Sequence, residues 1–259
     1  MTAPLLSVVT VVRDDLAGLR ATAASLRAQR PGLCEWLVAD GGSRDGTAAW
    51  LAAHADATAW WRSAPDGGPY HGMNAGLAAA RGRWVLFLNA GDTLAGPDTL
   101  GRLAAALAVQ PDADFLYGDA LERLADGREL RKPARALRWS FYGMVTHHQA
   151  MVYRRSLVGG LRYDTRFAIA ADYGFTLRVL ARAHRVVRLP FALCRFAPGG
   201  LSQRHPAAGR AEQRVIRREE LGLGTAACLG IMAIQWAAQR VRRDARRLYE
   251  KFRFAQPDT

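Results

Sequence analysis

Three aspartates of this sequence closely follow short apolar runs. Asp40 and Asp92 come after the runs 36–39 and 84–88, and Asp66 follows a third run after a short turn. Carboxylates gathered at one place repel one another unless a cation lies among them, and Mg²⁺ and Mn²⁺ prefer carboxylate and phosphate oxygens. The pattern therefore indicates a divalent cation that bridges a diphosphate. The alternative is that these aspartates serve only turns and helix caps.

The apolar runs read as strands covered on both faces, because they are continuous rather than alternating. The first is Leu6–Val12, and apolar residues with helical spacing fill the stretches 16–26 and 70–80 between the runs. This alternation of strand and helix predicts an α/β fold, with a mostly parallel sheet and helices on both faces. Ligands bind beyond the carboxyl ends of parallel strands, so the sheet would bring the three aspartates to one edge.

A second group of elements is expected after Asp114. It comprises strands at 115–121, 149–153 and 186–196, a hairpin turn at Asp126-Gly127 and a helix over 172–183. Pro190 should interrupt the last of these strands, because proline lacks a backbone donor. No internal repeat or low-complexity linker divides the sequence. We therefore expect one domain over residues 1–205, followed by a helical extension over 206–259.

The composition limits the class of partner. The chain has 259 residues, 50% of them hydrophobic, and its 36 basic residues give a net charge of +13. All of these except Lys132 and Lys251 are arginine, so arginine-rich coding accounts for part of the excess. No basic motif interleaved with aromatic residues occurs, which disfavours nucleic acid. A diphosphate substrate or an anionic membrane surface agrees better with the charge.

The use of cysteine and the start of the sequence favour a cytoplasmic protein. The three cysteines are scattered and show no C-x-x-C spacing; they are Cys34, Cys194 and Cys228. This pattern favours reduced thiols over a disulfide framework or a zinc site. Residues 1–4 lead directly into the first expected strand, without the pattern of a signal peptide.

The extension combines an uncharged stretch with a cluster of arginines. No charged residue lies between Glu220 and Arg240, and five arginines follow within residues 240–247. A helix would place four apolar residues on one face, namely Leu229, Met232, Ala233 and Trp236. Glycines and glutamines make the stretch too polar for a spanning helix of about twenty residues. We expect a basic amphipathic helix on the anionic cytoplasmic membrane surface, or alternatively a helix docked on the protein's own core or on a second copy, giving a homodimer.

Two arginines are candidates for binding phosphate: Arg13 after the first strand, and Arg204 in the loop 199–205. This loop could also close over a diphosphate as a lid, or be an ordinary exposed loop. The sequence has no G-x-G-x-x-G after the first strand and no G-x-x-x-x-G-K-[ST] anywhere. Since these are the two common phosphate-cradling loops, their absence disfavours a nicotinamide dehydrogenase and a P-loop enzyme.

Three stretches of the first half resemble motifs of one family. Residues 40–47 (DGGSRDGT) match a D-G-S-x-D-G-T signature with one extra glycine. Residues 63–76 (SAPDGGPYHGMNAG) match S-E-P-D-x-G-x-Y-x-A-M-N-x-G, and 89–92 (NAGD) stands for a D-x-D-like element. In this order they resemble the family 2 glycosyltransferases of the GT-A fold, and in particular bacterial enzymes of exopolysaccharide and colanic-acid-type assembly.

The likeness continues into the second half and covers roughly residues 5–203. His148-Gln149 matches an H-Q element of the family, and residues 171–173 (ADY) match the acidic element that carries the catalytic base. The resemblance implies a GT-A, Rossmann-like domain with a nucleotide-binding half over about 1–110 and an acceptor half over about 111–205.

The resemblance also implies roles for individual residues. Contacts to a nucleotide sugar would come from Thr10, Arg13, Asp40, Asp66, Asn74, Asn89 and Arg204. Asp92 would hold Mn²⁺ or Mg²⁺, but Asn89 replaces the first carboxylate of the D-x-D element and weakens that site. Asp172 would be the general base, with a helix cap as the alternative reading. His148 and Gln149 would contact the acceptor or support the residues that do.

The implied activity is that of an inverting glycosyltransferase at the inner face of the cell membrane. It would move a sugar from a nucleoside diphosphate sugar to a hydroxyl of a glycan precursor, expected to be lipid-linked, in cell-surface polysaccharide synthesis. The alternatives are a nucleotidyltransferase and a non-catalytic protein of the same fold that binds sugar nucleotides. A nucleotidyltransferase would have a glycine-rich basic loop after its first strand, and residues 11–14 (VVRD) do not form one.

Three further features allow two readings each. His147-His148 could contact a metal or the acceptor, or form an ordinary polar pair. Trp60-Trp61 could stack on a sugar, although packing in the core is the favoured reading. For Asp45 an Asp-Gly turn that leads into a helix is favoured over a site residue.

Overall fold

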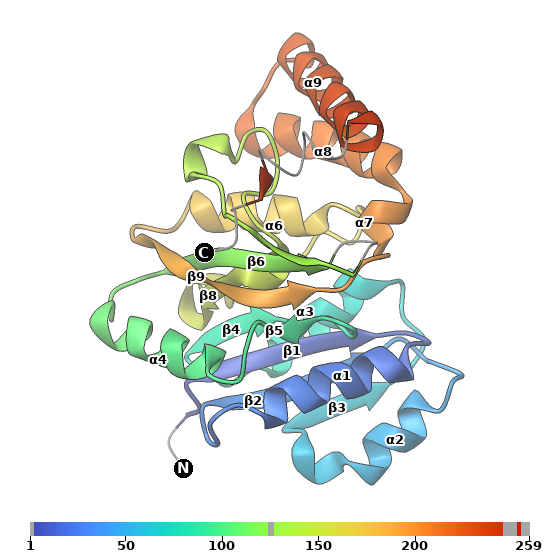
Figure 1. Cartoon of the computed structure of the whole chain (residues 1–259), viewed down its shortest axis with the longest axis vertical. Coiled ribbons are helices and arrows are strands. Elements are labelled where there is room, and N and C mark those ends of the chain that lie inside the picture. Colours follow the sequence, from blue (N-terminus) through green and yellow to red (C-terminus); the bar gives the residue numbers. More distant parts are fainter. Residues whose placement is uncertain (1–2, 124–126, 246–252, 255–259) are drawn as a thin grey trace.

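The computed structural model describes residues 3–123, 127–245 and 253–254, which fold around one mixed sheet of nine strands (Figure 1). The strand order is β3-β2-β1-β4-β8-β6-β9-β5, and β7 pairs with β6. The strands are β1 (Leu6–Val12), β2 (Cys34–Asp40), β3 (Trp60–Ser63), β4 (Trp84–Phe87), β5 (Thr93–Leu94), β6 (Phe115–Arg123), β7 (Glu129–Lys132), β8 (Met151–Arg154) and β9 (Val186–Phe196). The α-helices are α1 (Leu16–Arg27), α2 (Thr47–Ala53), α3 (Pro69–Ala79), α4 (Thr99–Val109), α5 (Arg155–Val158), α6 (Ala171–Leu180), α7 (Leu201–Arg204), α8 (Pro206–Leu221) and α9 (Thr225–Asp244).

The N-terminal half of the sheet is parallel, as its continuous apolar strands predict. β1 lies between β2 and β4, and β3 extends the sheet beyond β2. Alternate residues of β1 face two separate cores: Val9 and Val11 pack in the core that includes α3 and α6, whereas Val8 and Val12 pack with α1 and α4. Helices thus cover both faces of the sheet, and the predicted α/β class is confirmed (Figure 1).

The register of these strands brings their carboxyl ends together. Val12 at the end of β1 pairs with Asp40, and Asp40 pairs in turn with Ser63 at the end of β3. On the other side of β1, Val9 pairs with Phe87, so the loop that leads to Asp92 starts at the same edge. The segments that hold the three aspartates therefore meet at one edge of the sheet, as the sequence predicts.

The second half of the sheet is mixed. β8 is antiparallel to both of its neighbours, β4 and β6, whereas β9 is parallel to β6. The register of β6 and β9 shifts between Tyr117 and Asp119, opposite Pro190, because proline cannot donate to the ladder. The strand itself continues through Pro190, so the predicted interruption of β9 is wrong. The predicted hairpin is present as the antiparallel pair β6–β7, while its turn residue Asp126 lies outside the described residues. No periodicity predicts β5, which has only two residues.

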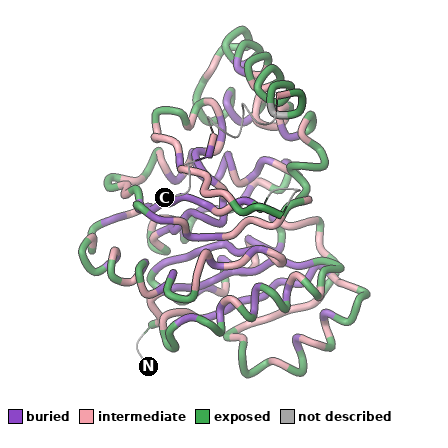
Figure 2. Tube along the Cα trace, in the orientation of Figure 1, coloured by how far each residue is buried: buried purple, intermediate pink, exposed green. Residues whose placement is uncertain are grey.

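The C-terminal helices stack on α6, away from the N-terminal half (Figure 1). α8 packs on α6 and ends at Gly222, whose left-handed φ of 64° lets the chain turn back into α9. Cys228 and Ile231 form the buried side of α9, whereas most of the helix is exposed (Figure 2). One side of the extension thus docks on the protein itself. Among the described helices, none combines the length and the apolar character needed to cross a bilayer.

Candidate active site

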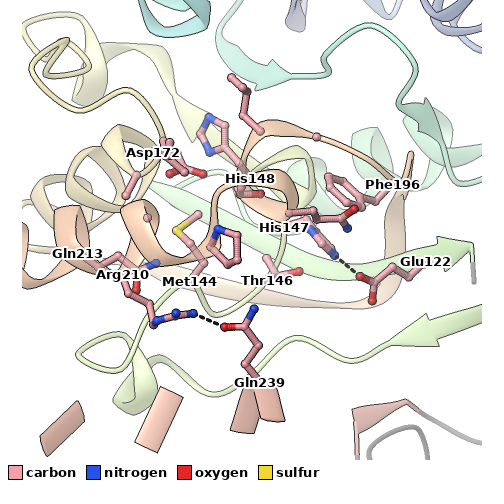
Figure 3. A pocket seen from close by; sticks show the side chains of 18 of the residues that line it. Glu122, Met144, Thr146, His147, His148, Asp172, Phe196, Arg210, Gln213 and Gln239 are labelled. Atoms are coloured by element: carbon pink, nitrogen blue, oxygen red, sulfur yellow. Dashed lines mark hydrogen bonds and ion pairs between the residues drawn. The ribbon is translucent and has the colours of Figure 1, made fainter. Parts of the chain in front are cut away.

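A cavity of about 1130 Å³ lies between the sheet edge and the C-terminal helices (Figure 3). Its wall includes Tyr70 from α3, Asn89 from the loop after β4 and Asp172 from α6. It also includes Arg210 from α8 and Gln239 from α9, whose side chains are hydrogen-bonded to each other. The cavity therefore joins residues of the predicted site to the C-terminal extension.

Asp172 is the second residue of α6 and lines this cavity. Its Oδ1 accepts a hydrogen bond from the backbone N–H of Tyr173 at 2.8 Å, and the hydroxyl of Tyr70 lies 3.3 Å from the same oxygen. Burial raises the pKa of Asp172 to about 6, against the opposing effect of these donors. Such a carboxyl can take up a proton near neutral pH, as a general base must. The N-cap of α6 is Ala170, so the structure does not support the cap reading of Asp172.

Glu212 on α8 holds the segment that leads to Asp172. Its carboxylate accepts hydrogen bonds from three successive backbone amides, at 3.0 Å from Ala168, 2.9 Å from Ile169 and 2.7 Å from Ala170. Its negative charge also contributes, less than burial does, to the raised pKa of Asp172. The sequence did not single out Glu212, because a glutamate in a highly charged helix is typical of a solvated face. Only the packing of α8 on α6 reveals its partners.

Asp92 and Gln149, two residues that the sequence predicts to share the site, are in direct contact. The Gln149 side chain donates a hydrogen bond of 2.6 Å to Asp92 Oδ2, and the backbone N–H of Ala197 donates one of 2.7 Å to Oδ1. Only 3% of Asp92 is exposed, and burial raises its pKa to about 7. The protein thus already supplies one donor to each oxygen of the predicted metal ligand.

Asn89 lies three residues before Asp92, in the loop after β4. Its side-chain Oδ1 is buried, lies in a residue that lines the cavity and has no hydrogen-bond partner among the described residues. Buried polar atoms are rarely left unpaired in proteins, so an absent donor or cation is expected there. The described residues hold no cluster of three or more His, Cys, Asp or Glu side chains suited to a metal. A cation bound beside Asn89 and Asp92 would need phosphate oxygens as further ligands, which is the usual situation for Mg²⁺.

Asp40 is fully buried and holds the glycine-rich turn that follows β2. It accepts hydrogen bonds from the backbone N–H and the hydroxyl of Ser43 and from the hydroxyl of Ser63. Gly42, next in this turn, has a left-handed φ of 81°, and a Cβ there would lie 2.8 Å from the backbone nitrogen of Pro65. The extra glycine of the signature therefore allows the turn to pack closely against the next loop.

The side chains of Asp66 and Arg13 both lie against Gly41. A Cβ at Gly41 would be 3.1 Å from Oδ1 of Asp66 and 3.5 Å from Cδ of Arg13. Asp66 also accepts a hydrogen bond of 2.9 Å from the backbone N–H of Gly68. Asp66 and Arg13 are both predicted to contact the nucleotide sugar, and they therefore lie together at the edge formed by β1, β2 and β3.

The polar side-chain groups of Thr10 and Asn74 form hydrogen bonds within the protein. The Thr10 hydroxyl is fully buried, donates to the carbonyl of Leu88 at 2.8 Å and accepts from the Trp36 indole at 2.9 Å. The prediction that Thr10 contacts the donor is therefore wrong, since its polar capacity is used inside the α1 side of the core. The Asn74 amide pairs with both the N–H and the carbonyl of Tyr163, at 2.8 and 3.0 Å, so it positions that segment.

His148 belongs to a buried aromatic cluster. Its ring nitrogens lie 2.8 Å from the hydroxyl of Tyr163 and 3.1 Å from that of Tyr153, and the ring stacks on Phe87 at 5.1 Å. Burial lowers the pKa of His148 to about 3, so the imidazole stays neutral. With both nitrogens bonded, His148 is suited to supporting the neighbouring Gln149 rather than to binding a metal.

His147 and part of the loop 199–205 also line the cavity. His147 stacks on Phe196 at 4.1 Å and lies 3.8 Å from Glu122 (Figure 3). In the loop, the residues from Gly200 to Gln203 line the cavity, whereas Arg204 at the end of α7 is exposed. The predicted lid thus contacts the cavity, but the predicted phosphate ligand Arg204 does not line it.

Trp60, Trp61 and Asp45 have the structural roles that the sequence favours. Trp60 and Trp61 contact the two cores on opposite faces of the sheet. Asp45 accepts hydrogen bonds from the hydroxyl of Thr47 at 2.6 Å and from the backbone N–H of Leu16 at 2.7 Å. It therefore fastens the starts of α2 and α1, and the structural interpretation of Asp45 is confirmed.

Known proteins share this sequence pattern and this fold. Residues 7–171 match the family described as Glycosyl transferase family 2. The uncharacterized glycosyltransferase Rv1514c of Mycobacterium tuberculosis is 39% identical over 211 residues, which cover 80% of each chain. A PGL/p-HBAD biosynthesis glycosyltransferase of Mycobacterium bovis is 33% identical over 192 residues, or 73% of this chain and 74% of that one.

Solved structures agree on the fold. TarS 1-349 of S. aureus in complex with UDP-GlcNAc superposes with a TM-score of 0.68 at 22% identity, covering 88% of this chain and 70% of that one. The match to the longer TarS chain covers 43% of its length. The mannosyltransferase PcManGT from Pyrobaculum calidifontis, solved with GDP-Man and Mn²⁺, gives a TM-score of 0.61 at 17% identity over 93% of this chain and 76% of that one.

The fold is therefore GT-A-like, with helices appended at its C-terminus. The chain belongs to glycosyltransferase family 2, whose members transfer a sugar from a nucleotide sugar. The predicted family and fold are confirmed.

Proposed function

We propose that this glycosyltransferase inverts the anomeric centre in a single displacement, with Asp172 as the general base. The acceptor hydroxyl attacks the anomeric carbon, Asp172 takes the hydroxyl proton, and the bond to the nucleoside diphosphate breaks with its electron pair on the leaving oxygen. The proposal depends on one observation, the buried carboxyl group of Asp172 on the wall of a large cavity, where burial raises its pKa to about 6. Assistance of this kind contributes roughly 10²–10⁴-fold to the rate.

The donor would bind at the edge formed by β1 to β4. Asn89 and Asp92 would hold Mn²⁺ or Mg²⁺ together with the donor phosphates, and such a cation stabilises the charge that develops on a leaving diphosphate. The unpartnered Oδ1 of Asn89 supports this position. Asp66 and Arg13 face the same edge, and Asp40 fixes the turn between them.

The acceptor would be a lipid-linked glycan precursor for cell-surface polysaccharide, reached from the inner face of the membrane. The exposed side of α9 supports this proposal, because four large apolar residues stand out from it; they are Leu229, Ile234, Trp236 and Val241, exposed by 50, 61, 54 and 44%. Arg240 and Arg243 follow on the same helix and are largely exposed. An apolar side beside arginines is typical of helices that lie on anionic bilayers.

A donor screen tests the proposed reaction. Nucleotide release from a panel of nucleoside diphosphate sugars would be measured with Mn²⁺, with Mg²⁺ and with a chelator, and the released sugar or product would be followed by proton NMR. We expect one donor class to be turned over, with the first-formed anomer opposite to that of the donor. Retention of the anomeric configuration would exclude a single displacement with Asp172 as the base.

A further inference from the structure

The wall of the cavity carries many basic residues, three of them on α8 and α9. Among the described lining residues, two carry carboxyl groups, namely Glu122 and Asp172, and six are basic: Arg123, Lys132, Arg135, Arg210, Arg240 and Arg243. Glu122 is paired with Lys132 at 3.1 Å. The remaining basic residues exceed what one carboxylate can balance, so this cavity suits an anionic ligand.

Two of these arginines have no carboxylate partner among the described residues. The guanidinium of Arg135 lies 5.4 Å from the ring centroid of Tyr142, and Arg210 donates to the side-chain oxygen of Gln239. Arg240 and Arg243, by contrast, both approach Asp244. A guanidinium matches phosphate oxygens in a bidentate manner, so arginines beside a cavity that lack a carboxylate partner are natural phosphate ligands.

The same part of the wall carries apolar and aromatic groups. Met144 and Tyr142 line the cavity next to Arg135, and Trp236 of α9 lines it beneath Arg240, whose guanidinium is 5.3 Å from the indole. In Figure 3, Met144 lies between Asp172 and the Arg210–Gln239 pair. The cavity thus combines the proposed base with basic residues and with an aromatic residue of α9.

The residues that α8 and α9 add to this wall, among them Arg210 and Trp236, lie outside the residues that match the family, whereas Arg135 lies within them. The family match ends at residue 171, whereas α8 and α9 span 206–244. The basic wall is therefore formed jointly by the matched part of the chain and by the two C-terminal helices.

We propose that Arg135 and Arg210 bind the phosphate or diphosphate of a lipid-linked acceptor, and that the lipid leaves the cavity past Trp236. The proposal deepens the proposed function and rests on it. A sugar attached to such a phosphate reaches Asp172 within the same cavity, while its phosphate meets the two arginines. The acceptor class is then an anionic glycolipid rather than a neutral one.

Binding of a simple isoprenoid tests this assignment. The probes are farnesyl diphosphate, farnesol and inorganic pyrophosphate, titrated calorimetrically into the full chain. The variant is Arg135→Gln with Arg210→Gln, and the matched control is Arg20→Gln with Arg27→Gln, two exposed positions of α1 that remove the same charge. A second variant, Arg135→Lys with Arg210→Lys, keeps the charge and guards against a folding defect.

We expect the full chain to bind farnesyl diphosphate at least about tenfold more tightly than farnesol or pyrophosphate, because both the charge and the chain contribute. The glutamine variant should lose about tenfold or more, the lysine variant less, and the α1 control nothing. Equal affinity of the glutamine variant and the parent overturns the proposal. A similar loss in the α1 control also overturns it, since the effect would then be one of total charge.

Two further measurements distinguish an acceptor phosphate from a bilayer headgroup, and the phosphate assignment from the proposed function. Vesicles of phosphatidylcholine with and without phosphatidylglycerol are sedimented with each variant. If the glutamine variant loses only vesicle binding, Arg135 and Arg210 bind bilayer headgroups and the acceptor assignment fails. Nucleotide release from the donor is measured in parallel. If the parent turns over no nucleotide sugar, the proposed function fails, whatever the isoprenoid titrations give.

Discussion

The carboxylates at the sheet edge and two of the arginines on the cavity wall differ in their partners. Each oxygen of Asp92 already accepts a hydrogen bond, and Asp40 accepts three. Arg135 and Arg210 have no carboxylate partner among the described residues. Prearranged dipoles suit a reaction centre, because they need no reorganisation during the reaction. Arginines without a carboxylate partner suit the recognition of a ligand that brings its own countercharge.

After the general base itself, the largest effect on the reaction should come from Glu212, which joins α8 to the segment that leads to Asp172. Glu212→Gln removes the charge that holds residues 168–170, so we expect kcat to fall by up to about 10²-fold through displacement of Asp172. The lost negative charge also lowers the pKa of Asp172, so the acid limb of kcat/KM should move to lower pH. The control is Glu219→Gln on the same helix, where the carboxylate only pairs with Arg166. Identical pH profiles for the two variants would contradict a positioning role for Glu212.

The next effect concerns stability and the buried carboxyl of Asp92. Its pKa of about 7 in the folded protein lies above the value of about 3.9 in an unfolded chain. The stability that this proton contributes is therefore present below about pH 4 and is lost as the pH rises through about 7, by at most about 4 kcal/mol. Asp92→Asn should flatten this dependence in urea unfolding, whereas Asp56→Asn at an exposed site should not. A parental slope in Asp92→Asn would refute the assignment.

The exposed side of α9 can be tested apart from the cavity. Leu229 and Ile234 do not line the cavity and are exposed by 50 and 61%, so Leu229→Gln with Ile234→Gln should leave donor turnover unchanged. Binding to anionic vesicles should weaken by about tenfold, because two large apolar side chains no longer insert. Val109→Gln on α4, exposed by 75%, is the matched control. Equal sedimentation of all three proteins would remove α9 from the membrane contact.

The smallest effect on activity is expected inside the sheet. Thr10→Val leaves the indole N–H of Trp36 without its acceptor and should cost about 1–3 kcal/mol of folding free energy. The KM for the donor should stay within about twofold, because the hydroxyl is fully buried away from the cavity. Asn89→Ala should do the reverse and raise the KM with little loss of stability. If Thr10→Val raised the KM as much as Asn89→Ala does, the burial argument would fail.

The fold was largely predictable, because each element has a local signature. The strands β1 and β9 span the predicted residues 6–12 and 186–196, since largely apolar runs leave few alternatives, although β9 continues through Pro190. The two-residue strand β5 has no such signature. Its pairing with β9 is a tertiary contact that local sequence does not encode.

The site was only partly predictable, because a polar residue near a motif can face either way. Asp92 and Gln149 do meet, and Asp172 does line the cavity. Thr10 faces inward, since alternation along β1 directs it to the α1 side of the core. Glu212 was missed because its partners lie more than forty residues away in sequence. Such contacts follow from how helices pack, which no motif records.

The central claim is that Asp172 removes the proton of the acceptor hydroxyl, and Asp172→Asn tests it most directly. Asparagine keeps the shape and the contact with the Tyr173 amide but cannot accept the proton. The affinity for the nucleoside diphosphate, measured by calorimetry, should stay within about twofold of the parent. Transfer of sugar to the acceptor should fall by at least about 10²-fold. Transfer by Asp172→Asn at the parental rate, with intact donor binding, would contradict the account.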